Sequence, residues 1–251
     1  MNKRGDVLDI NMSSQDLFSK PWFGFDLDDT LHEFRRASAS ASDHVFQTIH
    51  TAHNHLSIDT LKDSYQVILR NATANAFTDG RTSTEYRWER FDRLLQTHGI
   101  TDTVLLETLL DVYRDSLRAN LTLKDGALQL LQTLHQQGKK VTVITEGPAD
   151  AQEWTIHELG IHPYIDVLVT TNEIGRSKLD GLFGAVLKKY NIATKDIIYF
   201  GDNQVRDVQA ARAEGILAVL YDTAGSAELE DTNALRVNSW ATVENILVRG
   251  E

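Results

Sequence analysis

A short apolar stretch that ends in carboxylates is the part of this chain best suited to chemistry. Residues 22–30 read Trp-Phe-Gly-Phe-Asp-Leu-Asp-Asp-Thr, so Asp26, Asp28 and Asp29 follow a short apolar run. Such a run is typical of a strand buried in a parallel sheet, and open α/β sheets bind ligands at the carboxyl ends of their strands. Because clustered carboxylates repel one another, a divalent cation or a proton held by one of them would stabilise the group. The stretch predicts a metal-assisted site in which two carboxylates have different roles.

Three later segments place polar side chains after further predicted strands. These residues are Thr145 and Glu146, Ser177 and Lys178, and Asp202 and Asp207. Because the carboxyl ends of parallel strands meet at one edge of a sheet, we expect these residues to converge with Asp26 on one pocket. Carboxylates hold a hard cation such as Mg²⁺, while a lysine, a hydroxyl and free backbone N–H groups hold phosphate oxygens. This combination is what phosphoryl chemistry requires.

Beyond Leu121 the sequence alternates between helical and strand-like patterns. The predicted strands are 22–26, 140–145, 166–170, 197–200 and 217–220, the last of which we expect to be the final strand of the core. The helices predicted among them are 126–137, 149–159, 182–190 and 206–214. This alternation predicts βαβ units, and hence an α/β fold with a doubly wound, parallel-sheet, Rossmann-like core.

The segment before Leu121 has a different pattern, because apolar residues recur at helical spacing and no proline interrupts it. The helices predicted there are 37–56, 59–78, 84–98 and 102–119, with Asp59 and Asp102 as the N-caps of the second and the fourth. We therefore expect a helical bundle inserted over residues 35–120. The other expected parts are a core formed by residues 21–34 and 121–251 and a mobile N-terminal extension over residues 1–20.

Composition narrows the class of function. The 251 residues carry a net charge of −11 and no basic run, which argues against binding to a nucleic-acid polymer. The absence of cysteine excludes disulfides, thiolate catalysis and cysteine-ligated metals. No apolar run reaches the roughly 18 residues of a membrane helix. Since residues 1–20 also lack the apolar core of a signal peptide, we expect a cytoplasmic protein with no membrane partner; its oligomeric state is open.

Taken together, the motif segments resemble those of the haloacid dehalogenase superfamily, in the subgroup with a helical cap inserted after the first motif. The family pattern Asp-x-Asp-x-Thr matches residues 26–30. The residues that match its later motifs are Thr145, Lys178 and Gly201-Asp202 with Asp207. Each motif alone is weak, whereas four in order at predicted strand ends are specific. The resemblance covers residues 23–247 and implies that the bundle over residues 35–120 is a cap domain.

The resemblance implies covalent catalysis by Asp26. This carboxylate would form an aspartyl-phosphate, while Asp28 would protonate the leaving oxygen and then activate water. Family members that act as dehalogenases or cleave phosphonates lack an acid two residues after the nucleophile. The presence of Asp28 therefore favours the hydrolysis of a phosphomonoester.

The family resemblance also implies a Mg²⁺ ion and a phosphate subsite. The metal-site residues that it implies are Asp26, Asp28 through its backbone carbonyl, Asp202 and, in a supporting place, Asp207. The phosphate-binding residues that it implies are Thr145, Glu146 and Lys178. Two departures stand out: Glu146 replaces a common asparagine and adds negative charge, and Lys178-Leu-Asp-Gly replaces the usual Lys-Pro-Asp-Pro. The missing prolines leave the rigidity of the lysine loop open.

One helix of the expected bundle offers candidates for substrate selection. Residues 85–91 read Glu-Tyr-Arg-Trp-Glu-Arg-Phe, and the cations Arg87 and Arg90 alternate with aromatic rings. The segment resembles the Arg-Phe cap helix of family members that act on nucleotides and acidic sugars. The alternative is ordinary packing of a bundle with salt pairs on its surface.

The function predicted from these features is a Mg²⁺-dependent phosphatase that acts on a small soluble phosphomonoester. A nucleoside monophosphate, as for a 5'-nucleotidase, is the first candidate substrate, and sugar phosphates follow closely. One alternative is a hexose-phosphate mutase of the same superfamily, which would form an isomer without releasing phosphate. Two others are a receiver-like signalling domain that accepts a phosphoryl group and a non-enzymatic relative that binds partners through its cap.

Overall fold

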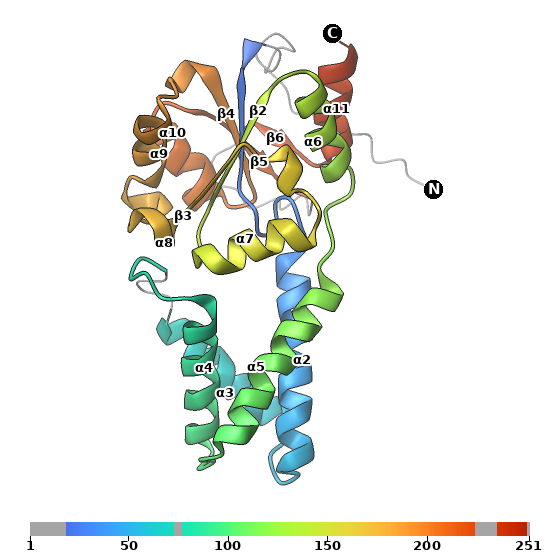
Figure 1. Cartoon of the computed structure of the whole chain (residues 1–251), viewed down its shortest axis with the longest axis vertical. Helices are drawn as coiled ribbons and strands as arrows, with labels where there is room; N and C mark the ends of the chain where they lie inside the picture. Colours follow the sequence, from blue (N-terminus) through green and yellow to red (C-terminus); the bar gives the residue numbers. More distant parts are fainter. Residues whose placement is uncertain (1–18, 73–76, 224–234, 250–251) are drawn as a thin grey trace.

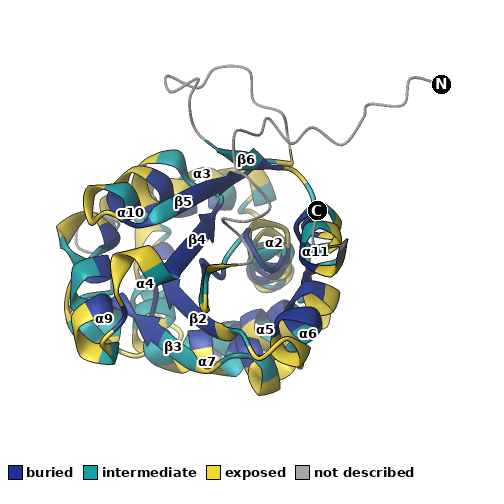
Figure 2. Ribbon diagram, turned by 90° about the horizontal axis from the view of Figure 1, so that it is seen from above, coloured by how far each residue is buried: buried dark blue, intermediate teal, exposed yellow. Residues whose placement is uncertain are grey.

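The fold is built on a parallel β-sheet whose strands come from both ends of the chain. The computed structural model describes residues 19–72, 77–223 and 235–249. Within them lies one six-stranded, all-parallel sheet of order β3-β2-β1-β4-β5-β6 (Figures 1 and 2). The strands are β1 (Trp22–Phe25), β2 (Lys140–Thr145), β3 (Val167–Thr170), β4 (Ile197–Gly201), β5 (Leu217–Tyr221) and β6 (Arg236–Val237). The predicted α/β class with a doubly wound parallel sheet is confirmed, whereas residues 1–18 of the expected mobile extension lie outside the described residues.

The order of the strands determines where a ligand site can form. From β1 the chain adds β2 and β3 on one side and β4, β5 and β6 on the other, so the direction of winding reverses between β1 and β4. Phe25 at the end of β1 is in register with Val143 of β2 and with Phe200 of β4. The residues that follow these strands therefore emerge side by side at the carboxyl edge, at the topological switch point.

Helices cover both faces of this sheet. They are α6 (Ala127–Gln136), α7 (Ala149–Glu158), α8 (Thr171–Ile174), α9 (Leu182–Tyr190), α10 (Ala210–Ala213) and α11 (Trp240–Arg249). Phe25, Val143 and Phe200 pack with α6 and α11 on one face, while Ile144 and Tyr199 pack with α9 on the other. Because both faces are buried, the central strands read as nearly continuous apolar runs (Figure 2).

A bundle of helices extends from the carboxyl edge of the sheet, below it in Figure 1. Its helices are α2 (Phe34–Ala52), α3 (Ile58–Ala72), α4 (Ser83–Thr97) and α5 (Thr103–Asn120). They enclose a hydrophobic cluster of their own, which includes Ile49, Leu61, Phe91 and Leu109. The bundle is attached to the core by the two chain segments that enter α2 and leave α5, and its apolar core is separate from those of the sheet.

Helix caps account for where two of these helices begin. Asp102 is the N-cap of α5 as predicted, because its carboxylate accepts the Leu105 N–H at 2.9 Å. The prediction of Asp59 as an N-cap is wrong, since α3 already begins at Ile58 and the Ser57 hydroxyl accepts the Thr60 N–H at 3.1 Å. The predicted helix 59–78 is described only as far as Ala72, because residues 73–76 lie outside the described residues.

Two predictions for the C-terminal half need correction. The segment 206–214 is not one α-helix: a π-helical turn, Gln204–Gln209, precedes the short α10. The Asn203 side chain accepts the N–H groups of Val205 and Arg206, which holds the wide first turn in place. Residues 217–220 are also not the final strand, because the two-residue β6 pairs with β5. A strand that short carries no periodicity from which to predict it.

No helix among the residues described combines the length and the apolarity needed to cross a lipid bilayer.

Trp240 at the start of α11 joins the C-terminal helix to the loop after β1. Its indole is fully buried, stacks on Tyr221 with ring centroids 4.2 Å apart and meets the edge of Phe25 at 5.6 Å. The indole N–H donates to the backbone carbonyl of Thr30 at 3.2 Å. A buried indole that also satisfies a backbone carbonyl supports both the packing and the position of that loop.

We predict that Trp240→Ala lowers the free energy of unfolding by about 3–5 kcal/mol, because it leaves a large cavity and an unpaired carbonyl. Urea denaturation measures this loss. The matched control is Trp88→Ala on α4, where the side chain is 46% exposed and the expected change is within about 0.5 kcal/mol. Equal effects of the two substitutions would contradict the packing role assigned to Trp240.

Candidate active site

Three buried charged side chains meet at the carboxyl edge of the sheet. Asp26 directly follows β1, Asp207 lies in the π-helical turn after β4, and Lys178 lies in the loop between α8 and α9. The Lys178 Nζ is 2.5 Å from Asp26 Oδ1 and 2.5 Å from Asp207 Oδ1. Asp26 and Asp207 are 181 residues apart along the chain. The structure nevertheless brings these three residues together, as the sequence predicted.

Burial controls the protonation of this group. Burial raises the pKa of the Asp26 carboxyl well above its usual range; Lys178 opposes this shift, while Asp207 and Asp28 add to it. Burial alone would lower the pKa of Lys178, but the charges of Asp207 and Asp26 outweigh it and raise that pKa. The lysine therefore stays cationic between carboxylates in a low-dielectric site, where charge pairs interact strongly.

Thr30 connects the ends of β1 and β4. Its buried hydroxyl donates to Asp26 Oδ2 at 3.3 Å, and the Thr30 hydroxyl oxygen itself accepts the Asp202 N–H at 3.0 Å. Gly201 is required beside it, because a Cβ at that position would lie 2.4 Å from the Cβ of Asp207. These contacts fix the loop after β4 against the loop after β1, so the positions of Asp26 and Asp202 are coupled.

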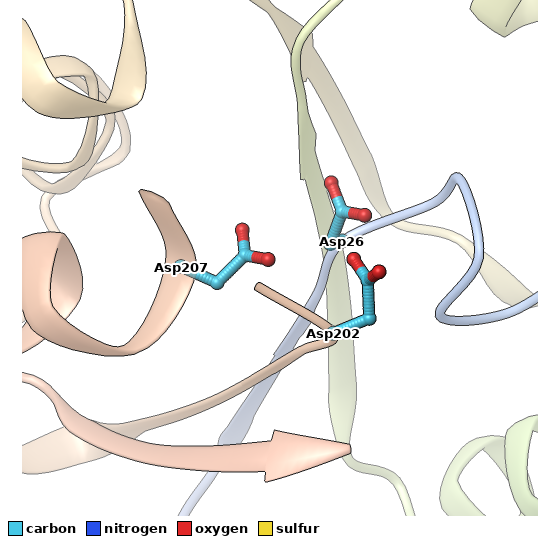
Figure 3. Close-up of side chains that lie close together, drawn as sticks. All are labelled: Asp26, Asp202 and Asp207. Atoms are coloured by element: carbon cyan, nitrogen blue, oxygen red, sulfur yellow. The ribbon is translucent and has the colours of Figure 1, made fainter. Parts of the chain in front are cut away.

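The carboxylates of Asp26, Asp202 and Asp207 gather round one point (Figure 3). Each offers an oxygen, and these oxygens lie within 4.8 Å of one another. A set of carboxylate oxygens alone suits a hard divalent cation such as Mg²⁺. Burial raises the pKa of Asp202, and the neighbouring Asp207 adds to the shift, so a cation placed there would stabilise the ionised forms.

The two oxygens of Asp207 already have protein partners. Its Oδ1 accepts from Lys178, and from the Tyr199 hydroxyl at 3.4 Å, while its Oδ2 accepts the Asn203 N–H at 2.9 Å. Asp202 instead meets the mostly exposed Arg35 guanidinium at 2.9 Å. Asp207 is thus placed to support the site by holding Lys178, while Asp202 is the most exposed carboxylate of the three and the most open to an added metal ion.

Asp28 and Asp29 occupy different places beside Asp26. Asp28 is partly exposed in the cavity, and its Oδ1 is 2.8 Å from the Nε2 of the buried His32. Asp29 has a left-handed backbone with φ of 62°, and its carboxylate accepts the Arg35 N–H at 3.0 Å. The first motif therefore turns sharply after Asp28, which directs the chain into α2.

Glu146 is a cavity-lining residue whose carboxylate has protein partners. Its Oε1 accepts the backbone N–H of Lys178 at 3.0 Å, and its Oε2 is 3.2 Å from Arg206. The added negative charge of Glu146 is thus balanced by Arg206. The loop of Lys178, which lacks the usual prolines, is connected to the end of β2 by the hydrogen bond to Glu146. Because a carboxylate repels phosphate, the side chain of Glu146 is better suited to holding Lys178 than to binding the phosphoryl group.

These residues line a cavity of about 550 Å³. Its walls from the core include all the candidates at the strand ends, namely Asp26, Asp28, Thr145, Glu146, Ser177, Lys178, Asp202 and Asp207. The Thr145 hydroxyl is 3.3 Å from Gln152 Oε1 and lies beside the carboxylates in this lining. The bundle contributes Phe77 and Thr78 from the segment before α4, so the cavity lies between the bundle and the core.

Arg87 and Arg90 are not among the residues that line this cavity. The Arg87 guanidinium lies 5.1 Å from the ring centre of Tyr113, and that of Arg90 lies 5.9 Å from Phe77. Both contacts are with aromatic rings of the bundle segment, which matches the packing alternative for this helix. No sequence pattern pointed to Phe77, whose φ of 70° is unusual for a residue with a side chain.

Polar contacts hold the start of α4 against the core. The Ser83 hydroxyl donates to Asp150 of α7 at 2.7 Å, and the Ser83 N–H donates to the same carboxylate at 2.9 Å. Nearby, the side chain of Asn172 donates to the carbonyl of Arg81 at 3.1 Å. Trp154 of α7 also packs against the apolar cluster of the bundle, so the bundle and the core meet through both polar and apolar contacts.

We predict that Lys178→Met lowers the free energy of unfolding by about 3–5 kcal/mol without divalent cations, because two buried carboxylates lose their counter-charge. Urea titration in the presence of a chelator measures this. The control is Lys189→Met, because Lys189 is an exposed lysine that pairs with Glu173 on the surface and should contribute less than about 1 kcal/mol. A loss no greater than that of the control would show that the buried pairs do not stabilise the fold.

Proteins similar to this chain include phosphatases, and the solved structures with a similar fold include a 2-haloacid dehalogenase and a proposed β-phosphoglucomutase. Two similar relatives are the ribulose-1,5-bisphosphate 5-phosphatase of Halopiger xanaduensis and a glyceraldehyde 3-phosphate phosphatase of Methanocaldococcus jannaschii. The first is 22% identical over 83% of this chain and 87% of its own length. The second is 24% identical over 82% of this chain and 87% of its own length. The magnesium-bound hydrolase YfnB of Bacillus subtilis superposes with a TM-score of 0.66 at 22% identity, over 91% of this chain and 98% of that one.

A sequence profile of the family described as haloacid dehalogenase-like hydrolases matches residues 24–221, which span all four motifs. This match confirms the resemblance inferred from the spacing of the motifs, and with it the prediction that the protein is an enzyme. The chain belongs to the haloacid dehalogenase-like hydrolase family.

Proposed function

We propose that this protein is a Mg²⁺-dependent phosphatase that hydrolyses a small sugar phosphate through an aspartyl-phosphate. The observation that carries the proposal is the buried Asp26 carboxylate, which is held 2.5 Å from a lysine and beside an all-oxygen cation site. A phosphoryl group next to Asp26 would meet the cation, Lys178 and the hydroxyl of Thr145, which together balance its charge. The similarity to phosphatases that act on sugar and triose phosphates supports the same reaction class.

The first step is transfer of the phosphoryl group to Asp26. A carboxylate oxygen attacks phosphorus, the bond from phosphorus to the leaving oxygen breaks, and that oxygen takes a proton from Asp28. In the second step Asp28 removes a proton from water, the water oxygen attacks phosphorus, and the bond to Asp26 breaks. Inorganic phosphate is released and both carboxyl groups return to their starting states.

Asp26, Asp202 and the backbone carbonyl of Asp28 would hold the Mg²⁺ ion, which neutralises charge when bound. Lys178 is positioned by Asp207 and by the Glu146 carboxylate at its backbone N–H. Burial of Asp26 keeps most of its side chain out of contact with bulk solvent, which strengthens its interactions with charged groups. The acid at Asp28 is what a phosphomonoester requires, because its leaving alkoxide is a poor leaving group without a proton.

The charges of the cavity favour a sugar phosphate as substrate. Its lining carries seven carboxylates, from Asp26, Asp28, Asp29, Glu146, Asp180, Asp202 and Asp207, against the cations Arg35, Lys178 and Arg206. This excess disfavours a second phosphate and suits a hydroxyl-rich leaving group that donates hydrogen bonds. A nucleoside monophosphate is less favoured, since Arg87 and Arg90, on which that expectation rested, do not line the cavity.

The inserted bundle of residues 35–120 would act as the cap of this site. Phe77 and Thr78 of the bundle face the same cavity as Asp26. The hydrogen bonds from Ser83 to Asp150 lie at the edge where the bundle meets the core. Movement at the two connecting segments would open and close the cavity and exclude water during the reaction.

We predict that Asp26→Asn reduces phosphate release by about 10³-fold or more, because the amide cannot form the covalent intermediate. The measurement is phosphate release from a panel of sugar phosphates and nucleoside monophosphates with Mg²⁺, with isomer formation followed in parallel. The control is Asp43→Asn, an exposed carboxylate of α2 that pairs with Lys62. Normal turnover by Asp26→Asn would remove Asp26 from the nucleophile role, and isomer formation without phosphate release would indicate a mutase.

We also predict that Mg²⁺ raises the thermal midpoint of the wild-type protein. At an ion concentration of 100 times Kd, binding to the folded state alone adds about 2.7 kcal/mol of stability. Asp202→Asn should remove most of this shift, since it takes one carboxylate from the metal cluster, whereas Asp166→Asn, far from the site in a surface pair with Lys140, should keep it. Identical shifts in both variants would contradict the proposed metal site.

A further inference from the structure

His32 is a fully buried histidine beside the site. It lies four residues after Asp28, at the point where the loop after β1 turns towards α2. Its backbone forms single β-bridges with Asp28 on one side and with Leu123 on the other. The imidazole packs against the ring of Phe34, with centroids 5.9 Å apart. The ring is therefore held by both main chain and packing.

The imidazole has one polar contact among the described residues. Its Nε2 lies 2.8 Å from Asp28 Oδ1, and its buried Nδ1 has no hydrogen-bond partner. If Nδ1 carried the hydrogen, a buried N–H would have no acceptor, which is costly. If Nδ1 carries no hydrogen, only an acceptor is left unsatisfied, which costs less. A doubly protonated ring would add a buried charge to that cost. The geometry therefore selects the tautomer that carries hydrogen on Nε2 and donates it to Asp28.

This contact makes the two oxygens of Asp28 unequal. Oδ1 accepts from His32, and the carboxyl group is otherwise exposed to the cavity, with 23% of the side chain accessible. A short side chain without such a partner would sample several rotamers. With Oδ1 held, Oδ2 is the oxygen left to exchange a proton with the leaving group and with water.

We infer that His32 is a positioning residue that orients Asp28 for proton transfer through Oδ2. The inference rests on the proposed phosphatase function, in which Asp28 is the general acid and base. A purely structural role would be filled as well by an apolar side chain, because the imidazole packs on the ring of Phe34 and follows the apolar Leu31. The single hydrogen bond of this buried ring is made instead to the cavity-lining Asp28.

The test compares substrates whose leaving groups differ in their need for a proton. An alkyl phosphate needs protonation of its leaving oxygen, whereas 2,4-dinitrophenyl phosphate does not. The variants are His32→Phe, which keeps the ring and removes the donor, and His32→Gln, which can place an N–H near the position of Nε2. Thr142→Val in β2 is the control, since it changes another fully buried polar side chain that has an unpaired polar atom among the described residues.

For His32→Phe we expect kcat/KM to fall by about 10²-fold with the alkyl phosphate, at the lower end of what general acid catalysis supplies. With 2,4-dinitrophenyl phosphate the fall should be no more than about threefold, and His32→Gln should recover most of the loss. A loss of equal size for both substrates, or no loss, would overturn the inference. If the wild-type protein hydrolyses neither substrate nor any sugar phosphate, it is the proposed function that fails.

A measurement on the wild-type protein keeps the inference testable if His32→Phe does not fold. The ¹⁵N spectrum of histidine-labelled protein, with the His32 signals assigned by their loss in His32→Gln or His32→Leu, distinguishes a protonated from a bare ring nitrogen. Hydrogen on Nε2 and none on Nδ1 supports the inference. The opposite tautomer, which cannot donate to Asp28, overturns it.

Discussion

The structure depends on one buried cation between carboxylates. Lys178 joins Asp26 after the first strand to Asp207 after the fourth, across the point where the winding of the sheet reverses. Taking these charges out of water is costly, so the group is stable only while every member is present and aligned. The same alignment places the buried carboxylate of Asp26, the ammonium group of Lys178 and a cluster of carboxylate oxygens beside one cavity. These are the groups that phosphoryl transfer requires.

The surrounding contacts serve that alignment. Thr30 couples Asp26 to the loop of Asp202, Gly201 makes room for Asp207, and Trp240 holds the carbonyl of Thr30 from behind. A substitution in the C-terminal helix that displaces Trp240 would therefore change the position of Thr30, and through it the positions of Asp26 and Asp202. The helical bundle has an apolar core of its own and meets the sheet domain through polar contacts and through Trp154 of α7, which packs against that core.

The departures from the family pattern have a physical explanation. Where prolines would stiffen the loop after Lys178, Glu146 accepts its backbone N–H and is itself balanced by Arg206. The extra carboxylate thus ties the loop that carries the lysine to the end of β2. His32 has a comparable relation to Asp28: Glu146 contacts the backbone of Lys178, and His32 contacts the carboxylate of Asp28. Such partners have no fixed spacing from the groups that they hold, so their roles are hard to infer in advance.

The sequence by itself determined the class of fold, the motif residues and their order, because buried strands, helices and terminal carboxylates leave local patterns of period and composition. It also placed the N-cap Asp102 correctly. It did not reveal the two-residue β6, the π-helical turn at Asp207 or the positions of Arg87 and Arg90, since each depends on distant packing. The partners of Glu146 and His32 and the entry of Phe77 into the cavity were likewise decided by the tertiary structure. Side-chain direction and hydrogen bonding between remote segments are fixed only when the sheet brings those segments together.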